Sequence, residues 1–176
     1  MTDTRRVFTL EGVRLKQLLD EYDLPSDVWR PDKAPNTGYF GGGTPGPKST
    51  MDKVTYASDT TAAVPGAALS VARSGLAATG NSEAGYFGGG EPATAKMDKT
   101  TYSSDTTAAV PGANLSVARR YLAATGNSTH GYFGGGRTNL PSPIMDKTTY
   151  STDTTAAAPS ATLKFAPGTA AVVSDE

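Results

Sequence analysis

The chain has 176 residues with 16 basic and 17 acidic side chains, and its hydrophobic fraction of 37% is below the usual level for globular chains. The balanced charge argues against nonspecific nucleic-acid binding, which depends on clustered lysine and arginine, and the lack of cysteine excludes disulfides and thiolate metal sites. We expect no secretory signal and no membrane span, because no apolar run approaches about 18 residues, and we expect synthesis in a cytoplasm.

The first predicted domain, residues 1–37, is helical. Apolar side chains recur at i, i+3, i+4 and i+7 within residues 10–22, which predicts one face of a short helix. Pro25 ends this helix, and residues 30–37 form a proline-containing linker. The apolar face either packs on its own domain or docks on a neighbouring protein. The docking hypothesis assigns contact with the neighbour to Leu15, Leu18, Leu19, Tyr22 and Trp29.

The second predicted domain, residues 38–176, is dominated by an internal repeat. Residues 51–90 and 97–136 differ at only seven of forty positions, and repeats start near residues 38, 85 and 131. A period of this length indicates supersecondary units that bury their apolar faces against one another. Near-identical copies also favour scaffolding or multivalent contact over one asymmetric active site.

Each period predicts four short strands. A short apolar run such as Leu76–Thr79 is closed by a Gly-Asn-Ser turn and followed by Gly-Tyr-Phe and three glycines. The MDKTTY segment alternates apolar and polar residues, and a Ser-Asp-Thr turn precedes Thr-Ala-Ala-Val. Four strands per period match one propeller blade, so the sequence predicts a mainly β domain.

These segments resemble a kelch repeat, in which an apolar strand ends in glycines and a later small-residue run leads to an arginine. They are more similar to the YFGGG-repeat proteins of marine tailed phages such as cyanophages, which carry GYFGGG, DKTTYSSDT and LAATGNS cassettes. The resemblance covers residues 38–176, and the stretch ending at 25–29 is similar to the leader of those proteins. It implies a virion or tail-associated structural protein. The triple glycine and the missing strand-terminal tryptophan depart from ordinary kelch repeats.

The two ends of the repeat region are complementary. The first period enters at GYFGGG without its apolar strand, and the third ends in a predicted apolar strand over Gly168–Val173. This gives three kelch-like blades per chain, fewer than the four to eight of usual propellers. We expect the C-terminal strand to complete a blade of a second chain, so that two chains form a six-bladed wheel. A trimeric β-prism is the alternative.

Repeated glycines, arginines and aspartates are candidate site residues with structural explanations. The glycine triplets are expected to permit positive φ angles rather than to cradle phosphate. The resemblance implies that Arg73 and Arg119 satisfy carbonyl groups of the neighbouring blade; an anion-binding ring is the alternative. Asp59, Asp105 and Asp153 are expected to accept hydrogen bonds from amides of their own turns, with calcium binding as the alternative.

Positions that vary between the copies point to a ligand or partner surface, with tolerance of change in exposed loops as the alternative. His130 is the only histidine, so a zinc or copper site of the usual kind is not expected. We predict no enzyme activity and neither a cofactor nor a metal site. The predicted surface consists of Arg120, Tyr121, Thr129 and His130.

The expected function is that of a structural component of a tailed-phage virion, at the tail or a tail fibre. Its N-terminal segment would dock on other virion proteins, and its repeat domain would bind a host-surface glycan or support a fibre. Self-association into a homo-oligomer is part of this expectation. The alternative is a cytoplasmic kelch-type adaptor that gathers protein partners.

Overall fold

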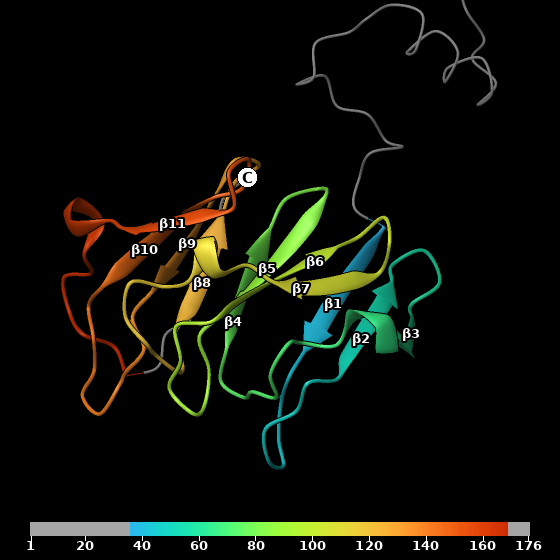
Figure 1. Cartoon of the computed structure of the whole chain (residues 1–176), viewed down its shortest axis with the longest axis horizontal. Helices are drawn as coiled ribbons and strands as arrows, with labels where there is room; N and C mark the ends of the chain where they lie inside the picture. Colours follow the sequence, from blue (N-terminus) through green and yellow to red (C-terminus); the bar gives the residue numbers. More distant parts are fainter. Residues whose placement is uncertain (1–35, 169–176) are drawn as a thin grey trace, which may run out of the picture. The chain divides into compact units, whose positions relative to one another are not determined.

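The computed structural model describes residues 36–168, which form three antiparallel sheets that follow one another along the chain (Figure 1). The first sheet contains β1 (Thr37–Gly41), β2 (Met51–Thr55) and β3 (Thr60–Ala63). The second contains β4 (Ala77–Gly80), β5 (Ala84–Gly88), β6 (Met97–Thr101) and β7 (Thr106–Ala109). The third contains β8 (Ala123–Gly126), β9 (His130–Gly134), β10 (Met145–Thr149) and β11 (Thr154–Ala157). A short 3-10 helix follows the last strand of each sheet: η2 (Pro65–Ala67), η3 (Pro111–Ala113) and η4 (Pro159–Ala161).

The predicted mainly β fold is therefore confirmed for the described residues, with four strands in each complete repeat. The predicted helix over residues 10–22 and the docking residues Leu15, Leu18, Leu19, Tyr22 and Trp29 lie outside residues 36–168. The predicted strand over 168–173 also lies outside them except for Gly168. Within residues 36–168, no helix is long and apolar enough to span a membrane.

Short polar turns fix the strand register. In the second sheet Thr101 pairs with Thr106 across the turn, and the side chains of Ser104 and Thr106 share a hydrogen bond of 2.7 Å. Because neighbouring side chains in a strand point to opposite faces, this register sends Asp98 and Lys99 of β6 to opposite faces of the sheet. The aspartate and the lysine of each MDK segment therefore point to opposite faces of their sheet.

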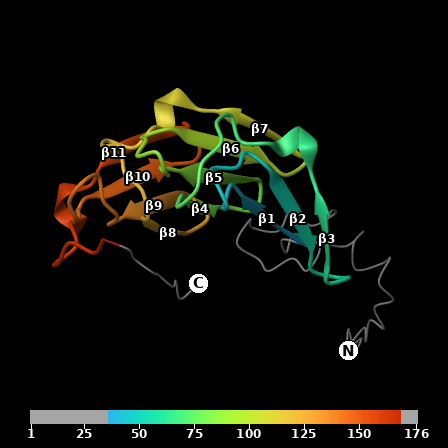
Figure 2. The same ribbon diagram turned by 90° about the horizontal axis from the view of Figure 1, so that it is seen from below.

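The second and third sheets meet along their Ala-Ala-Thr-Gly strands. β4 and β8 lie side by side, as seen from below in Figure 2. A Cβ atom on Gly131 would lie 2.5 Å from Cγ2 of Thr79, so glycine is required for this approach. The glycine of this Gly-Tyr-Phe segment therefore allows the second and third sheets to pack closely.

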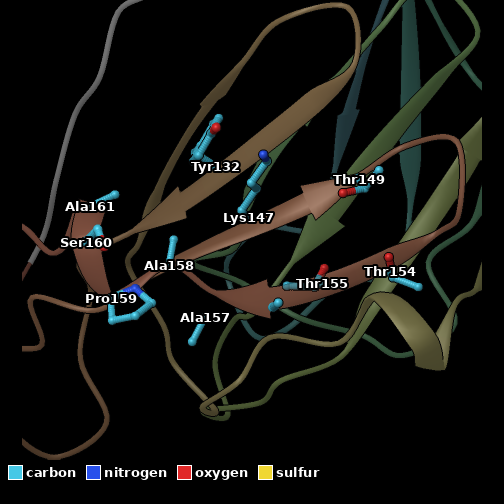
Figure 3. Close-up of a pocket in the computed structure, with 11 residues that line it drawn as sticks. Tyr132, Lys147, Thr149, Thr154, Thr155, Ala157, Ala158, Pro159, Ser160 and Ala161 are labelled. Carbon is cyan, nitrogen blue, oxygen red and sulfur yellow. The ribbon is translucent and has the colours of Figure 1, made fainter.

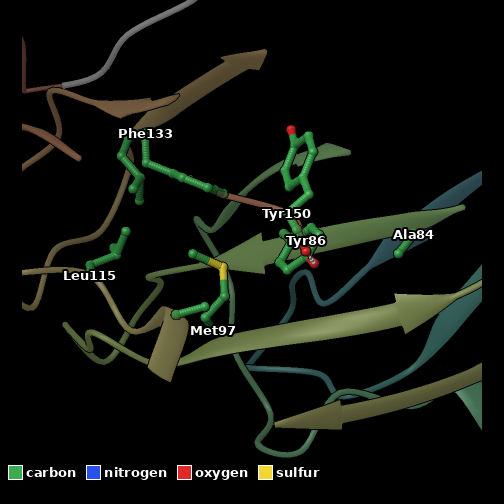
Figure 4. Close-up of a cluster of buried hydrophobic side chains, with 8 residues drawn as sticks. Ala84, Tyr86, Met97, Leu115, Phe133 and Tyr150 are labelled. Atoms are coloured by element: carbon green, nitrogen blue, oxygen red, sulfur yellow. Dashed lines mark hydrogen bonds between the residues drawn. The ribbon is translucent and has the colours of Figure 1, made fainter. Parts of the chain in front are cut away.

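The apolar core lies between the sheets and repeats with them. Between the second and third sheets, Phe133 of β9 packs with Met97, Ala113 and Leu115 (Figure 4). Between the first and second sheets, Phe87 of β5 packs with the residues at the same repeat positions, Met51, Ala67 and Leu69. Each sheet thus buries its apolar residues only against its neighbour, as the repeat period predicts.

The second and third glycines of each triplet adopt positive φ angles, as the structural interpretation predicts. Gly89 has a φ of +69°, and an added Cβ would lie 2.6 Å from the Arg119 carbonyl oxygen and 2.7 Å from Leu122 Cδ2. Gly46 has nearly the same φ, +68°, but open space around it. Alanine substitutions at these two positions therefore distinguish the cost of backbone strain, which both share, from the cost of steric overlap, which only residue 89 has.

We expect Gly89→Ala to lower the free energy of unfolding by about 2–5 kcal/mol, since it adds overpacking to the left-handed backbone penalty. Gly46→Ala carries the penalty alone and is expected to cost about 1–2 kcal/mol. Urea denaturation of both variants measures the difference. Equal losses would show that residue 89 is not held against the Arg119 backbone.

Candidate functional site

The contact between the first and second sheets is made by a tyrosine and a lysine that share one aspartate. Tyr39 donates a hydrogen bond from its hydroxyl to Asp105, in the turn after β6. Lys53 Nζ lies 2.9 and 3.0 Å from the two carboxylate oxygens of Asp105. The rings of Tyr39 and Tyr102 stack with centroids 5.1 Å apart. Because Lys53 and Asp105 stay partly exposed, this pair fixes the relative position of the sheets more than it adds stability.

The contact between the second and third sheets repeats this arrangement. Tyr86 donates to Asp153, and Lys99 Nζ lies 2.9 Å from both carboxylate oxygens of Asp153. The rings of Tyr86 and Tyr150 stack with centroids 5.0 Å apart. We term this set of contacts the inter-sheet junction: a tyrosine and a lysine of one sheet bind an aspartate of the next, beside a stacked tyrosine pair.

A buried arginine completes each inter-sheet junction. Arg73 donates to the carbonyl oxygens of Gly89 and Lys96 at 2.7 and 2.8 Å, and to Asp98 at 2.5 Å. Arg73 and Asp98 are 1% and 0% exposed. Burial lowers the pKa of Arg73, and Asp98 opposes this effect. The implication that this arginine satisfies carbonyls of the neighbouring sheet is confirmed.

Arg119 repeats these contacts in the second junction. It donates to the carbonyl oxygens of Gly135 and Ile144 at 2.8 and 2.7 Å and binds Asp146, and both charged side chains are fully buried. A buried guanidinium enclosed by carbonyl groups and one carboxylate has no open side for a diffusing anion. We therefore assign these arginines to the structure of the junction.

The turn aspartates differ from the sequence-based expectation. Asp105 and Asp153 accept hydrogen bonds from the preceding sheet, so the expectation that they bond amides of their own turns is wrong. Hydroxyl groups close the turns instead, as between Thr152 and Thr154 at 2.7 Å. Each aspartate has a φ of +51° and its carboxylate is available to the neighbouring sheet.

The junction groups give the fold a defined pH range. Hydrogen bonds from Tyr39 and then Lys53 lower the pKa of Asp105, and similar bonds outweigh burial and lower the pKa of Asp153. Burial first, then the bond to Asp153, raises the pKa of Tyr86 above 10.0, and burial raises the pKa of Tyr102 to about 12. The carboxylates therefore favour folding above about pH 4, and the neutral tyrosines favour it below about pH 10.

We expect the free energy of unfolding to fall as the pH drops below about 4, because the aspartates must then bind protons. We expect a second fall above about pH 10, where the unfolded chain loses tyrosine protons more readily than the folded one. Urea midpoints across the pH range measure both limbs. Asp153→Asn should flatten the acid limb, and an unchanged limb would contradict the role of this carboxylate.

The third sheet ends in an open hollow of about 460 Å³ (Figure 3). Tyr132 and Lys147 line one side, and the chain from Thr154 to Ala161 lines the other. Lys147 Nζ lies over the Tyr132 ring at 6.0 Å, as Lys99 Nζ lies over Tyr86 at 5.6 Å. The hollow thus holds the tyrosine and lysine of an inter-sheet junction, and among residues 36–168 no aspartate of another sheet binds them.

The structure does not bring the four residues of the predicted ligand surface together. Arg120 forms an ion pair with Glu91 and lies near the Tyr121 ring, before β8. Thr129 and His130 lie after β8, and Thr129 Oγ1 and His130 Nδ1 are 2.8 Å apart. The two pairs therefore occupy opposite ends of this strand.

Thr129 and His130 belong to a second hollow, also of about 460 Å³, between the turns of the second and third sheets. Asn81 and Glu83 contribute from the second sheet, and Asn81 Nδ2 donates to the carbonyl of Ser128 at 3.4 Å. This hollow offers hydroxyl, amide and carboxylate groups close to the surface. Such groups suit a ligand rich in hydroxyls.

The inter-sheet contacts of the repeated tyrosine, lysine and aspartate were not predicted from the sequence, although the turn aspartates were candidate residues. The signal was present, because each recurs at the same place in all three periods: Tyr39, Tyr86 and Tyr132; Lys53, Lys99 and Lys147; Asp59, Asp105 and Asp153. Among residues 36–168, no three histidine, aspartate or glutamate side chains gather to hold a metal ion. The chemistry of the described residues is hydrogen bonding, ion pairing and stacking.

The chain matches no protein-family model and no curated protein.

Proposed function

We propose that this chain is a structural component of a tailed-phage virion, associated with the tail or a tail fibre. Residues 1–37 dock on other virion proteins, and the repeat domain projects outward for host attachment or fibre support. The observation that carries the proposal is the inter-sheet junction, which occurs twice with the same side chains at the same positions. A contact that the chain already repeats within itself suits assembly from further copies, which supports a structural role.

We further propose that the three sheets are kelch-like propeller blades. The side-by-side position of β4 and β8 supports this, because these would be the inner strands of adjacent blades. The bonds from Arg73 and Arg119 to carbonyl groups of the following sheet agree with what the kelch resemblance implies. In this arrangement a second chain completes the wheel; a trimeric β-prism would instead require three chains.

The attachment surface in this proposal is the hollow that contains Thr129 and His130. Its polar groups can exchange hydrogen bonds with sugar hydroxyls, and several weak contacts gain strength when copies of the chain are held together. The ligand class is therefore a host-surface glycan.

A glycan array tests the attachment surface. The folded wild-type protein is expected to bind a subset of glycans, and the double variant Thr129→Ala with His130→Ala is expected to lose most of this signal. Thr94→Ala, a substitution outside the hollow, serves as the control. Equal binding by all three proteins would contradict the assignment of this hollow.

Electron microscopy of particles tests the virion role separately. Antibodies against residues 38–176 are expected to label the tail of purified particles of the phage that encodes this chain. Particles made with a chain lacking residues 1–35, a deletion that leaves β1 whole, are expected to lose the label while the repeat domain stays in the lysate. Intact wild-type particles without label would contradict the virion role and favour the cytoplasmic adaptor.

A further inference from the structure

The first sheet exposes side chains that are buried at the same positions of the other sheets. Phe40 of β1 is 68% exposed, whereas its counterparts Phe87 and Phe133 are 4% and 0% exposed. Tyr56 is 54% exposed, whereas its counterpart Tyr150 is 6% exposed. The counterparts are buried because a preceding sheet covers them. The first sheet therefore presents half of an inter-sheet junction, which we term the first-sheet face: Phe40, Asp52, Tyr56 and Asp59.

The third sheet exposes the other half. Met145 is partly exposed, whereas its counterparts Met51 and Met97 are 2% and 0% exposed beneath the phenylalanine of the next sheet. Tyr132 and Lys147 line the open hollow in which the next aspartate would lie (Figure 3). We term this the third-sheet face: Tyr132, Met145, Lys147 and Leu163.

The two faces are complementary in charge and in shape. Among residues 36–168, the Asp59 carboxylate has no cationic partner, and Lys147 has no carboxylate partner. Their counterparts join in both internal junctions, as Asp105 with Lys53 and Asp153 with Lys99. Phe40 is exposed on the first-sheet face, and Met145 and Leu163 are partly exposed on the third-sheet face. In the second junction the residues at these repeat positions pack together, Phe133 with Met97 and Leu115.

We propose that a second copy of this chain docks head to tail, its first-sheet face on the third-sheet face of the first copy. The partner's Asp59 accepts hydrogen bonds from Tyr132 and Lys147, and the partner's Tyr56 stacks on Tyr132. The partner's Phe40 packs against Met145 and Leu163, as Phe133 packs against Met97 and Leu115. This deepens the self-association in the proposed function and does not depend on the virion role.

A second copy fits these faces better than an unrelated protein does. In both internal junctions, the residues at the positions of the third-sheet face contact an aspartate, a tyrosine and a phenylalanine of the next sheet. An unrelated protein would have to reproduce a phenylalanine, a tyrosine and an aspartate in the same relative positions. The second copy carries them in the same repeat.

One difference makes the docking reversible. Pro167 occupies the repeat position of Arg73 and Arg119, so the partner's Asp52 meets no guanidinium when it is covered. Covering a carboxylate without a partner opposes association. The junction between copies is therefore weaker than the two internal junctions. Pro167→Arg restores the missing cation and is expected to tighten self-association at least about tenfold.

A charge-swap pair tests which faces meet, with sedimentation velocity on the full chain as the measurement. Asp59→Lys and Lys147→Asp are each expected to weaken self-association at least about tenfold, because each creates a like-charge contact. An equimolar mixture is expected to restore it, since Lys at 59 of one variant then faces Asp at 147 of the other, and the second junction keeps the wild-type pair. Thermal unfolding midpoints measured at dilutions where the wild type is monomeric are expected to be unchanged and verify that both variants fold.

The apolar contact is tested by Phe40→Ser, with Val117→Ser as the control at another exposed apolar position. Phe40→Ser is expected to weaken self-association at least about tenfold, and the control to leave it unchanged. A mixture of the charge-swap variants that stays dissociated would overturn the proposal, as would single variants that associate like the wild type. A wild-type chain that remains monomeric at about 100 μM would also overturn the proposal, because the dissociation constant of the dimer would then exceed that concentration.

Discussion

Replacing Arg119 by methionine is expected to lower the free energy of unfolding by about 3–5 kcal/mol, because it leaves the fully buried Asp146 carboxylate without its cation. The carbonyl oxygens of Gly135 and Ile144 lose their donor as well. A loss of this size corresponds to a fall in the thermal unfolding midpoint of about 10 °C or more for a domain of this length. Urea denaturation and calorimetry measure the two quantities.

Two further variants isolate the buried charge as the cause. Arg137→Met removes an exposed arginine whose guanidinium lies over the Tyr121 ring at 5.0 Å, and it is expected to change stability by no more than about 1 kcal/mol. The double variant Arg119→Met with Asp146→Leu is expected to recover part of the loss, because no unpaired charge then remains. A double variant less stable than Arg119→Met alone would contradict this explanation.

Phe133→Ala is expected to destabilise the chain by about 3–5 kcal/mol, since Phe133 is fully buried between the second and third sheets. Phe40→Ala changes the same residue of the same Gly-Tyr-Phe-Gly segment, but Phe40 is 68% exposed. At dilutions where the chain is monomeric, Phe40→Ala is expected to cost less than about 1 kcal/mol. The two positions thus form a matched pair.

Chemical denaturation of both alanine variants at low protein concentration measures the difference. Because the local sequences are alike, intrinsic strand propensity cancels, and the difference reports the neighbouring sheet alone. Similar losses at the two positions would show that the first sheet already has a cover over Phe40. That outcome would also remove the apolar part of the first-sheet face.

The strands could be predicted from the sequence because pattern and repetition agree. Alternation in the MDKTTY segments and glycine at strand ends predicted the elements observed as β6 and β10, and the second copy confirmed each assignment made on the first. The three-stranded first sheet also follows from the pattern, because the first period lacks the Ala-Ala-Thr-Gly strand. Local periodicity is sufficient for elements of this kind.

Contacts between sheets could not be predicted in the same way. An aspartate in a Ser-Asp-Thr turn has two available roles, one within its turn and one toward another sheet, and the sequence does not distinguish them. In the structure the hydroxyl groups on either side of Asp105 and Asp153 bond to each other, and both carboxylates bind the neighbouring sheet. Likewise, the nearness of Tyr121 and Thr129 in sequence concealed that β8 separates them.

Only the structure shows that the same repeat position is exposed in the first sheet and buried in the second and third sheets. Phe40, Phe87 and Phe133 stand in the same motif, so the sequence treats them as equivalent. Their exposures of 68%, 4% and 0% show that one of them lacks the neighbour that the other two have. This difference is a property of the position in the array and has no local sequence signal.

Native mass spectrometry of the full chain over a range of concentrations shows whether the chain assembles by repeating its inter-sheet junction between copies. One chain has a mass of 18.1 kDa. We expect a species of two chains, about 36 kDa, to replace the monomer as concentration rises, and we expect Phe40→Ser and Asp59→Lys to suppress it. A three-chain species would contradict the two-chain wheel in favour of a prism, and a monomer at every concentration would contradict head-to-tail assembly.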